Sequence, residues 1–229
     1  MWPTFTPVAD HALLVSFGDV VCEGISATVV ALDRALAAAP APGMTECVPA
    51  FVNLLIDFDP LHTDHAEVRT HVEHLLRDLR HTRTAGTLHE VEVCYDGDGF
   101  APDLAAVAGA AGCSIDAVIA AHLQAEYTVR LYGFAPGYAY LSGVPQAIQV
   151  PRKPAAMRDV PAGSVLIAGP QCLVSTLTMP TGWSILGRSP TQILRRDADR
   201  PFLFDVGDRV RFRRIDLGQY AAQCGARHA

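Results

Sequence analysis

The feature that most constrains the fold is a change in local composition near Tyr127. Beyond it, short β-prone runs alternate with glycine and proline. Fifteen of the 60 residues from 131 to 190 are glycine or proline, against 19 of the other 169. Many short strands with regular breaks are typical of a β-barrel or a β-sandwich. We therefore predict a β-rich C-terminal region with no long helix after Tyr127.

The first ninety residues alternate between strand and helix patterns. Apolar or alternating runs predict four strands, and apolar residues three and four apart predict two helices, the second capped by Asp64. The strands are expected at 11–17, 45–49, 51–58 and 88–94, with helices around 25–36 and 64–79. The order β-α-β-β-α-β is that of a ferredoxin-like domain. We therefore predict such a domain over residues 1–94.

Two short helices are expected between these regions, over 103–111 and 114–126, with Asp103 and Ser114 as N-caps. No low-complexity linker separates the two halves of the chain. The predicted fold class is therefore α+β, with a second domain over residues 95–229 in which two short helices precede the β-barrel.

Composition excludes several classes of protein. Charged residues make up 18% of the chain, half of the residues are apolar, and the net charge is −6. These values argue against disorder and against nonspecific binding of nucleic acid. No basic, apolar leader pattern and no membrane-length apolar run are found. The six cysteines are scattered, as is usual for reduced thiols, so we expect a cytoplasmic protein that does not bind a membrane.

The segment from 131 to 190 differs in charge from the rest of the chain. Its ionisable residues sum to +3, and they are Arg152, Lys153, Arg158, Asp159 and Arg188. Guanidinium groups bind carboxylate and phosphate in a bidentate geometry. This pattern predicts a cationic pocket for a small anion. The alternative is that these cations pair with acidic residues of the N-terminal half.

Other residues of the same segment could complete such a pocket. Phe134 and Tyr140 lie in a Gly/Pro-rich run, where aromatic side chains can form a ligand wall or an ordinary core. Ser164 follows a Pro/Gly turn that is not a GxSxG nucleophile elbow. It is therefore expected to be a hydrogen-bond donor rather than a nucleophile, with Gln171 as a further polar candidate.

The histidines and acidic residues do not form a recognisable metal-binding pattern, so no metal site is predicted. His122 ends a predicted helix just before the β-rich region, where a structural contact is favoured over a catalytic role. The sequence has no Walker A run and no biotin-attachment sequence, and Lys153 is the only lysine.

Four segments in a fixed order resemble the allophanate hydrolase subunit 1 family, also called the carboxyltransferase domain C/D family. The segments are LYGFAPGYAYLSGVP, PRKPAAMRDVPAGSVLIAGPQ, PTGWSILGRSP and DVGDRVRFRRI. With two N-terminal segments, the resemblance covers about residues 8 to 216. It implies a ferredoxin-like N-terminal domain followed by a cyclophilin-like β-barrel domain.

The resemblance also implies a function. It suggests one component of a cytoplasmic, ATP-dependent 5-oxoprolinase-type amidohydrolase, which converts 5-oxo-L-proline to L-glutamate. The expected partners are a subunit 2 or C-type protein of the same enzyme and an A-type protein of the LamB/YcsF kind. ATP, with Mg²⁺, is expected in the assembled complex, with no covalently bound cofactor.

The resemblance suggests roles for residues of the basic segment. Its arginines would hold a carboxylate or a phosphorylated intermediate, polar side chains would orient it, and aromatic side chains would form the wall. The expected substrate-binding residues are Phe134, Tyr140, Arg152, Lys153, Arg158, Ser164, Gln171, Trp183 and Arg188. The catalytic residues are not identified, and the candidates are Arg158, Ser164 and His122.

Two other functions remain open at this point. One is a KipI-like inhibitor of a sensor histidine kinase, and the other is half of a biotin-dependent carboxyltransferase of the urea/allophanate pathway. The chain also departs from the family between Gln171 and Trp183, where it reads QCLVSTLTMPTGW instead of a run with Tyr-Pro and a Gly-Gly-Trp. This loop is expected to influence the choice of substrate.

Overall fold

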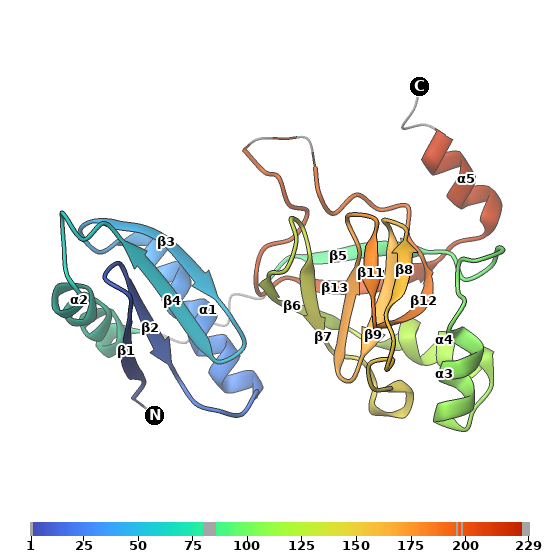
Figure 1. Ribbon diagram of the computed structural model, residues 1–229, viewed down its shortest axis with the longest axis horizontal. Helices are drawn as coiled ribbons and strands as arrows, with labels where there is room; N and C mark the ends of the chain where they lie inside the picture. The colour runs from blue at the N-terminus through green and yellow to red at the C-terminus, as the bar shows by residue number, and fades with distance from the viewer. Residues whose placement is uncertain (1, 80–85, 196, 198, 226–229) are drawn as a thin grey trace. The chain divides into compact units, whose positions relative to one another are not determined.

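The computed structural model describes residues 2–79, 86–195, 197 and 199–225. The chain divides into two compact units, residues 1–85 and residues 86–229 (Figure 1). Each unit has a hydrophobic core of its own. The units are therefore described separately.

Unit 1 is a four-stranded antiparallel sheet with two helices on one face (Figure 1). The strand order is β1-β2-β4-β3. The elements are β1 (Thr4–Val8), β2 (Ala12–Ser16), α1 (Glu23–Ala38), β3 (Met44–Pro49), β4 (Asn53–Phe58) and α2 (His65–Asp78). The two helices and three of the strands were predicted from the sequence, whereas β1 was not.

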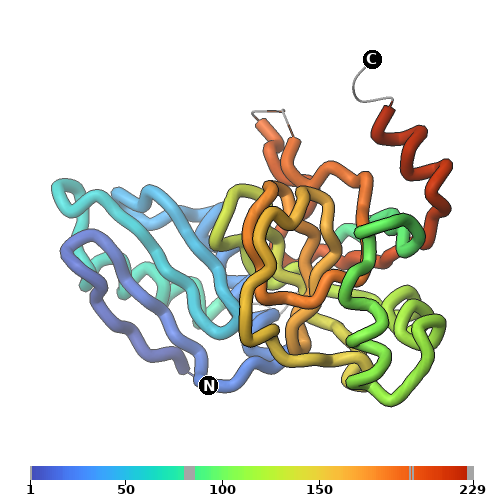
Figure 2. The backbone as a smooth tube through the Cα atoms, turned by 45° about the vertical axis from the view of Figure 1, so that its right-hand side comes forward, coloured from blue at the N-terminus to red at the C-terminus, as the bar shows by residue number. Residues whose placement is uncertain are grey.

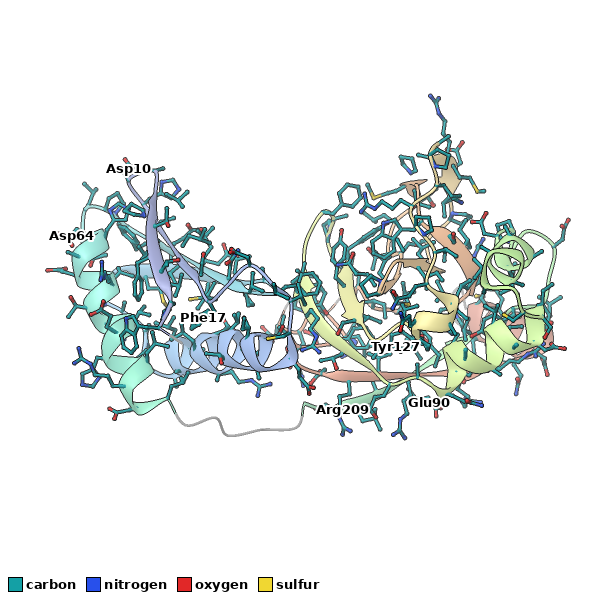
Figure 3. All side chains as sticks on the ribbon, turned by 90° about the horizontal axis from the view of Figure 1, so that it is seen from below. Asp10, Phe17, Asp64, Glu90, Tyr127 and Arg209 are labelled. Carbon is teal, nitrogen blue, oxygen red and sulfur yellow. The ribbon has the colours of Figure 1, made fainter. Side chains whose placement is uncertain are left out.

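Alternation along the strands fixes which face of this sheet is buried. Leu54, Ile56 and Phe58 alternate along β4 and pack against helix residues such as Val29 and Val68. The predicted cap of α2 is confirmed, since the Asp64 carboxylate accepts hydrogen bonds from two backbone amides at 2.9 Å. Figure 3 shows Asp64 at the start of this helix.

The ferredoxin-like arrangement predicted for residues 1–94 is not confirmed. The strand expected to complete it, β5 (Leu88–Val93), pairs in parallel with β13 (Arg209–Arg214) of unit 2. The position beside β2 is taken instead by β1. The structure consequently divides at residue 85, whereas the sequence placed the boundary at 94. The alternation of β5 predicts a buried face, but it does not say which core buries it.

Unit 2 is built around a seven-stranded sheet that closes almost completely into a barrel. The strand order is β12-β9-β10-β7-β6-β13-β5. Its edge strands are joined where Cys94 and Arg188 exchange two backbone hydrogen bonds of 2.8 Å. The strands not yet given are β6 (Tyr127–Tyr132), β7 (Ala139–Ser142), β9 (Ser164–Ala168), β10 (Gln171–Val174) and β12 (Ser184–Arg188). The predicted β-barrel is therefore confirmed.

The strands of the barrel are buried on both faces. Val165 and Ile167 of β9 point into the main core, whereas Leu166 and Ala168 belong to a smaller cluster on the other face. Residues of the two-stranded sheet β8 (Met157–Val160) and β11 (Met179–Thr181) pack in that smaller cluster. This double burial explains why β9 reads as a continuous apolar run instead of an alternating one.

Unit 2 also contains helices outside the barrel. The predicted pair is present as α3 (Leu104–Ala111) and α4 (Ile115–Gln124), and a short 3-10 helix, η1 (Gln146–Ile148), packs against both. The Ser114 cap is confirmed, but the Asp103 carboxylate makes no cap bond. It accepts hydrogen bonds from Lys153 and from the Ile185 amide instead. Helix α5 (Leu217–Gly225), which was not predicted from the sequence, follows β13 (Figure 2).

Among the described residues, no single helix is long and apolar enough to cross a membrane. Helices α3 and α4 reach the necessary length and hydropathy only as a pair bent by 92°. Val107, Val118 and Ile119 of this pair lie in the core of unit 2.

Candidate functional site

A cavity of about 250 Å³ lies where three strands of the barrel meet at one end. Ser164, which begins β9, is paired with Arg188, the last residue of β12, and β10 runs antiparallel to β9 so that it also ends here. The residues just outside these strand ends, before β9 and after β10 and β12, line the cavity together with one side chain of α5. They are Ala162, Gly163, Ser175, Thr176, Ser189, Thr191, Gln192, Ile193, Leu194 and Tyr220.

The cavity lining supplies hydroxyl and backbone groups. Four of its side chains are Ser or Thr, and none is Asp, Glu, His, Cys or Lys. The hydroxyls are held by the turns: Ser175 accepts from the Ser164 amide at 2.9 Å, and Ser189 accepts from the Thr191 amide at 3.1 Å. The cavity is thus suited to hydrogen bonding with a ligand, but it lacks a general base.

Arg188 brings a positive charge to this end of the barrel. Its guanidinium lies over the ring of Phe100 at 5.1 Å, and its Cδ is 3.5 Å from the position a Cβ would take at Gly163 in the cavity wall. Its Nε is buried without a hydrogen-bond partner. A guanidinium beside a cavity can bind an anionic ligand.

The arginines of β13 provide a contrast. They form ion pairs with Glu90, Glu92, Asp96 and Glu126, although Nε of Arg209 is, like that of Arg188, buried without a partner. Figure 3 labels Glu90 and Arg209 among these residues. Within the described ranges, by contrast, Arg188 has no carboxylate partner. Its charge therefore has no counter-charge among the described residues.

Ser164 lies at the same end of the barrel but does not face the cavity. Its side chain is fully buried, and its hydroxyl donates to the Pro161 carbonyl at 2.7 Å. The Ser175 hydroxyl donates to the same carbonyl at 3.0 Å. The structure therefore places Ser164 in the turn that shapes the cavity, where it holds neighbouring groups in position.

Three of the predicted residues form a separate group, which we call the Trp183 cluster: Tyr140, Arg152 and Trp183. The Arg152 guanidinium lies 5.6 Å from the Trp183 ring centre, and the Tyr140 and Trp183 rings meet edge to face at 5.8 Å. Lys153 lies next to the cluster, but its ammonium group pairs with Asp103 at 2.6 Å. The alternative left open by the sequence was pairing of the arginines with acids of the N-terminal half, whereas this pair joins the lysine to an acid of unit 2.

The predicted set is therefore divided between two ends of the same strands. Ser184, which follows Trp183, is paired with Ile167, and Gln171 is paired with Ala168. Both are about 10–13 Å along β9 from Ser164. Phe134 and Arg158 belong to neither group and are exposed, Phe134 by 73%. The structure brings together only Ser164 and Arg188 of the nine predicted binding residues at the cavity end.

His122 is part of the barrel core. Its side chain is fully buried, its Nδ1 is 2.7 Å from the Tyr95 hydroxyl, and its ring packs on Phe212 at 4.4 Å. Burial lowers the pKa of His122 to about 3, so the imidazole is neutral at ordinary pH. A side chain in this position does not contact a ligand in the cavity, and its role in the structure is in packing.

The site residues do not fit a metal or a nucleotide. Across the described parts of the chain, no group of three or more His, Cys, Asp or Glu side chains could hold a metal ion. The cavity offers no carboxylate for Mg²⁺ and no lysine for a triphosphate. Its volume is also below the roughly 300 Å³ at which pockets for drug-sized molecules begin.

Sequence reasoning missed the residues that line the cavity. Ser175 and Ser189 follow directly after strands, and such hydroxyls at strand ends are a usable signal. Tyr220 could not have been found this way. Its neighbour Phe100 is 120 positions earlier in the chain, so only the fold reveals their contact at 4.8 Å.

Comparisons with known proteins agree with this architecture. The B-type subunit of 5-oxoprolinase from Bacillus subtilis (strain 168) is 33% identical over 229 residues, which cover 94% of each chain. The corresponding B-type subunit from Escherichia coli O157:H7 is 42% identical over 123 residues, covering 54% of this chain and 56% of that protein.

Solved structures give the same picture. TTHA0988 is 36% identical with a TM-score of 0.78, and the match covers 90% of this chain and 40% of that one. The uncharacterized protein PH0987 from Pyrococcus horikoshii is 35% identical with a TM-score of 0.56, covering 95% of this chain and 100% of that one. The Kluyveromyces lactis urea amidolyase shares the fold, with a TM-score of 0.75 at 14% identity over 96% of this chain and 15% of that one.

The family model described as carboxyltransferase domain, subdomain C and D, matches residues 3–204. This range contains all of unit 1 from β1 onward and the barrel as far as the loop before β13. The matched range and the 33% identity to a 5-oxoprolinase protein over nearly the full length of both chains indicate the same family. The chain belongs to the carboxyltransferase subdomain C and D family.

Proposed function

We propose that this chain is the B-type component of an ATP-dependent 5-oxoprolinase, which opens 5-oxo-L-proline to L-glutamate. The observation that carries the proposal is the 33% identity to the B-type subunit of the Bacillus subtilis enzyme over 94% of both chains. The proposed partners are the C-type protein of the same enzyme and an A-type protein of the LamB/YcsF kind. Because the reaction consumes ATP, we place the complex in the cytoplasm.

The geometry of the cavity supports a role in binding. 5-Oxo-L-proline is a five-membered cyclic amide with one carboxylate, a size that suits a cavity of about 250 Å³. The guanidinium of Arg188 beside the cavity suits that carboxylate. The lining contains no general base, so the groups that activate water would come from a partner chain.

ATP is proposed to bind elsewhere in the assembly. The cavity offers neither the volume nor the cationic and carboxylate groups that a magnesium nucleotide needs. The contribution assigned to this chain is therefore recognition of the cyclic substrate, and we route no step of phosphoryl transfer through its residues.

The test is co-expression of the chain with its two proposed partners, followed by an assay of glutamate release. We expect a co-purifying complex that forms glutamate only when ATP is present. Arg188→Gln should raise the KM for 5-oxo-L-proline about tenfold or more, because a charged hydrogen bond contributes about 1.5–3 kcal/mol. The matched control is Arg211→Gln, on the outer side of β13, which should leave KM unchanged. An intact complex that releases no glutamate from 5-oxo-L-proline and ATP would contradict the proposal.

The fold likeness to urea amidolyase favours one other candidate, a carboxyltransferase acting in urea breakdown. At 14% identity this likeness concerns the fold alone. The same complex should therefore also be assayed with urea, bicarbonate, ATP and a biotinylated carrier. Carboxylation of urea without hydrolysis of 5-oxo-L-proline would replace the first proposal with this one.

A further inference from the structure

Helix α5 provides part of the cavity wall although it lies outside the family match. The family model ends at residue 204, whereas α5 spans Leu217–Gly225. One side chain of this helix, Tyr220, lines the cavity at the end of the barrel. The chain thus completes a cavity built by the common fold with an element beyond the matched range.

Few contacts hold α5 in place. None of its residues is buried. The Tyr220 ring meets Phe100 edge to face at 4.8 Å, the Gln223 amide donates to Glu92, and Asp216 and Gln219 exchange hydrogen bonds at the start of the helix. A helix with no buried apolar face contributes little to the stability of the core. Its placement against the cavity therefore calls for an explanation other than core packing.

The Tyr220 ring and the Arg188 guanidinium both pack against the ring of Phe100. The Arg188 guanidinium lies over the Phe100 ring at 5.1 Å, and the Tyr220 ring packs on Phe100 as well. Burial raises the pKa of Tyr220 and a hydrogen bond with Cys224 adds to the rise, while the charge of Arg188 and a hydrogen bond with its guanidinium oppose it. The Tyr220 hydroxyl and the Arg188 guanidinium therefore lie within hydrogen-bond reach of each other, so that both can face one bound anion.

We propose that α5 is the closing wall of a carboxylate site, in which Arg188 and the Tyr220 hydroxyl hold the carboxylate of a small ligand. The Tyr220 ring would also limit how large that ligand can be. The choice of ligand rests on the proposed function, since 5-oxo-L-proline is the small carboxylate it supplies. The site itself rests on the cavity, the unpartnered Nε of Arg188 and the position of Tyr220.

The test is calorimetric titration of the full chain with three probes. These are 5-oxo-L-proline, 2-pyrrolidinone, which has the same ring without a carboxylate, and L-lactate, which has a carboxylate without the ring. We expect binding of 5-oxo-L-proline and none of 2-pyrrolidinone. Tyr220→Ala should weaken binding at least tenfold, and Tyr220→Phe should weaken it less, because it removes only the hydroxyl.

Two further variants keep the result interpretable. A chain ending at Asp216 should bind as weakly as Tyr220→Ala, and it is expected to fold because α5 buries no residue. Leu217→Ala, on the same helix but outside the cavity wall, should bind like the unaltered chain. Thermal melting of every variant confirms that the barrel is intact.

The outcomes separate this inference from the proposed function. Equal binding by Tyr220→Ala and the unaltered chain, or equal binding of 2-pyrrolidinone and 5-oxo-L-proline, would overturn the inference. Tyr220-dependent binding of L-lactate without binding of 5-oxo-L-proline would keep the carboxylate site and contradict the substrate. Tyr220-dependent binding of 5-oxo-L-proline together with an inactive complex would contradict only the proposed hydrolysis.

Discussion

At the scale of single residues, the candidate site residues were predicted from their chemical type, but the structure places them in different surroundings. Arg188 and His122 both carry nitrogen groups that can bind a ligand, but Arg188 lies beside the cavity wall and His122 is enclosed by the barrel. Burial raises the pKa of Tyr95, so its hydroxyl stays protonated and shares a hydrogen bond with Nδ1 of His122. The imidazole is neutral and serves as a core residue.

The buried His122 predicts how stability depends on pH. Its pKa in the folded chain, about 3, is below the ordinary value of 6.5, so the unfolded chain binds more protons between these values. The free energy of unfolding should therefore fall as the pH is lowered from about 6.5, by up to about 1.4 kcal/mol per pH unit from this group. Urea unfolding at pH 7 and pH 5 measures the effect. His122→Gln should show a smaller decrease, and an equal decrease in both proteins would contradict the assignment.

Residue chemistry could be predicted from the sequence more readily than residue proximity. The basic segment contains Arg188, which the structure places beside the cavity, and the Ser164 hydroxyl, which was expected to act as a donor, donates to the Pro161 carbonyl. Arg152, Trp183 and Gln171 were expected to share the same pocket because they lie nearby in sequence. The strands that carry them separate them instead, since β9 places its two ends about 13 Å apart.

At the scale of elements, a strand could be predicted more reliably than its partner. The alternation of Leu88 to Val93 indicated β5 correctly, but its pairing with β13 spans about 120 residues of sequence and leaves no local signal. Strand β1 was missed because it contains Pro7 and buries none of its residues fully. Helix α5 was also missed, although Leu217, Tyr220, Ala221 and Cys224 recur at helical spacing, because a pattern only nine residues long is weak evidence for a helix.

The turn before β9 yields a prediction about an element boundary. Gly163 has φ of +83°, and a Cβ there would lie 2.5 Å from the Ser189 carbonyl oxygen. Gly163→Ala should therefore lower the free energy of unfolding by about 1–3 kcal/mol beyond the cost of its backbone conformation. The matched control is Gly169→Ala, which shares a positive φ of +53° but has no atom within 4 Å. If denaturant unfolding shows equal losses for both variants, the close contact is not important.

At the scale of the whole molecule, the chain consists of two units with separate cores. The core of unit 1 is formed by the four-stranded sheet and its helices, and the core of unit 2 draws on residues from Val91 to Phe212. The sequence predicted two domains but placed β5 in the first one. That single strand moves the boundary from 94 to 85 and changes what an independently folding fragment must contain.

The boundary can be tested with two fragments of unit 2. The fragment 86–229 keeps β5, which supplies Val91 and Val93 to the core and pairs with β13 along its whole length. It should unfold cooperatively on heating. The fragment 95–229, which follows the boundary predicted from sequence, should lack a cooperative transition or aggregate, because β13 loses one of its two neighbouring strands and becomes an exposed edge. Cooperative unfolding of the shorter fragment at the same temperature would show that β5 is dispensable.

The residue that joins the two edges of the barrel also carries the guanidinium at the cavity. Arg188 makes both bonds of the junction with Cys94 through its backbone, while its side chain reaches the Phe100 ring. Opening of the junction and release of a ligand are therefore thermodynamically linked, since whatever restrains the side chain also disfavours separation of the edge strands. Amide hydrogen exchange at Cys94 and Arg188 should slow when the cavity is filled. The exchange rates of these two backbone amides would then report whether the cavity is occupied, without any added label.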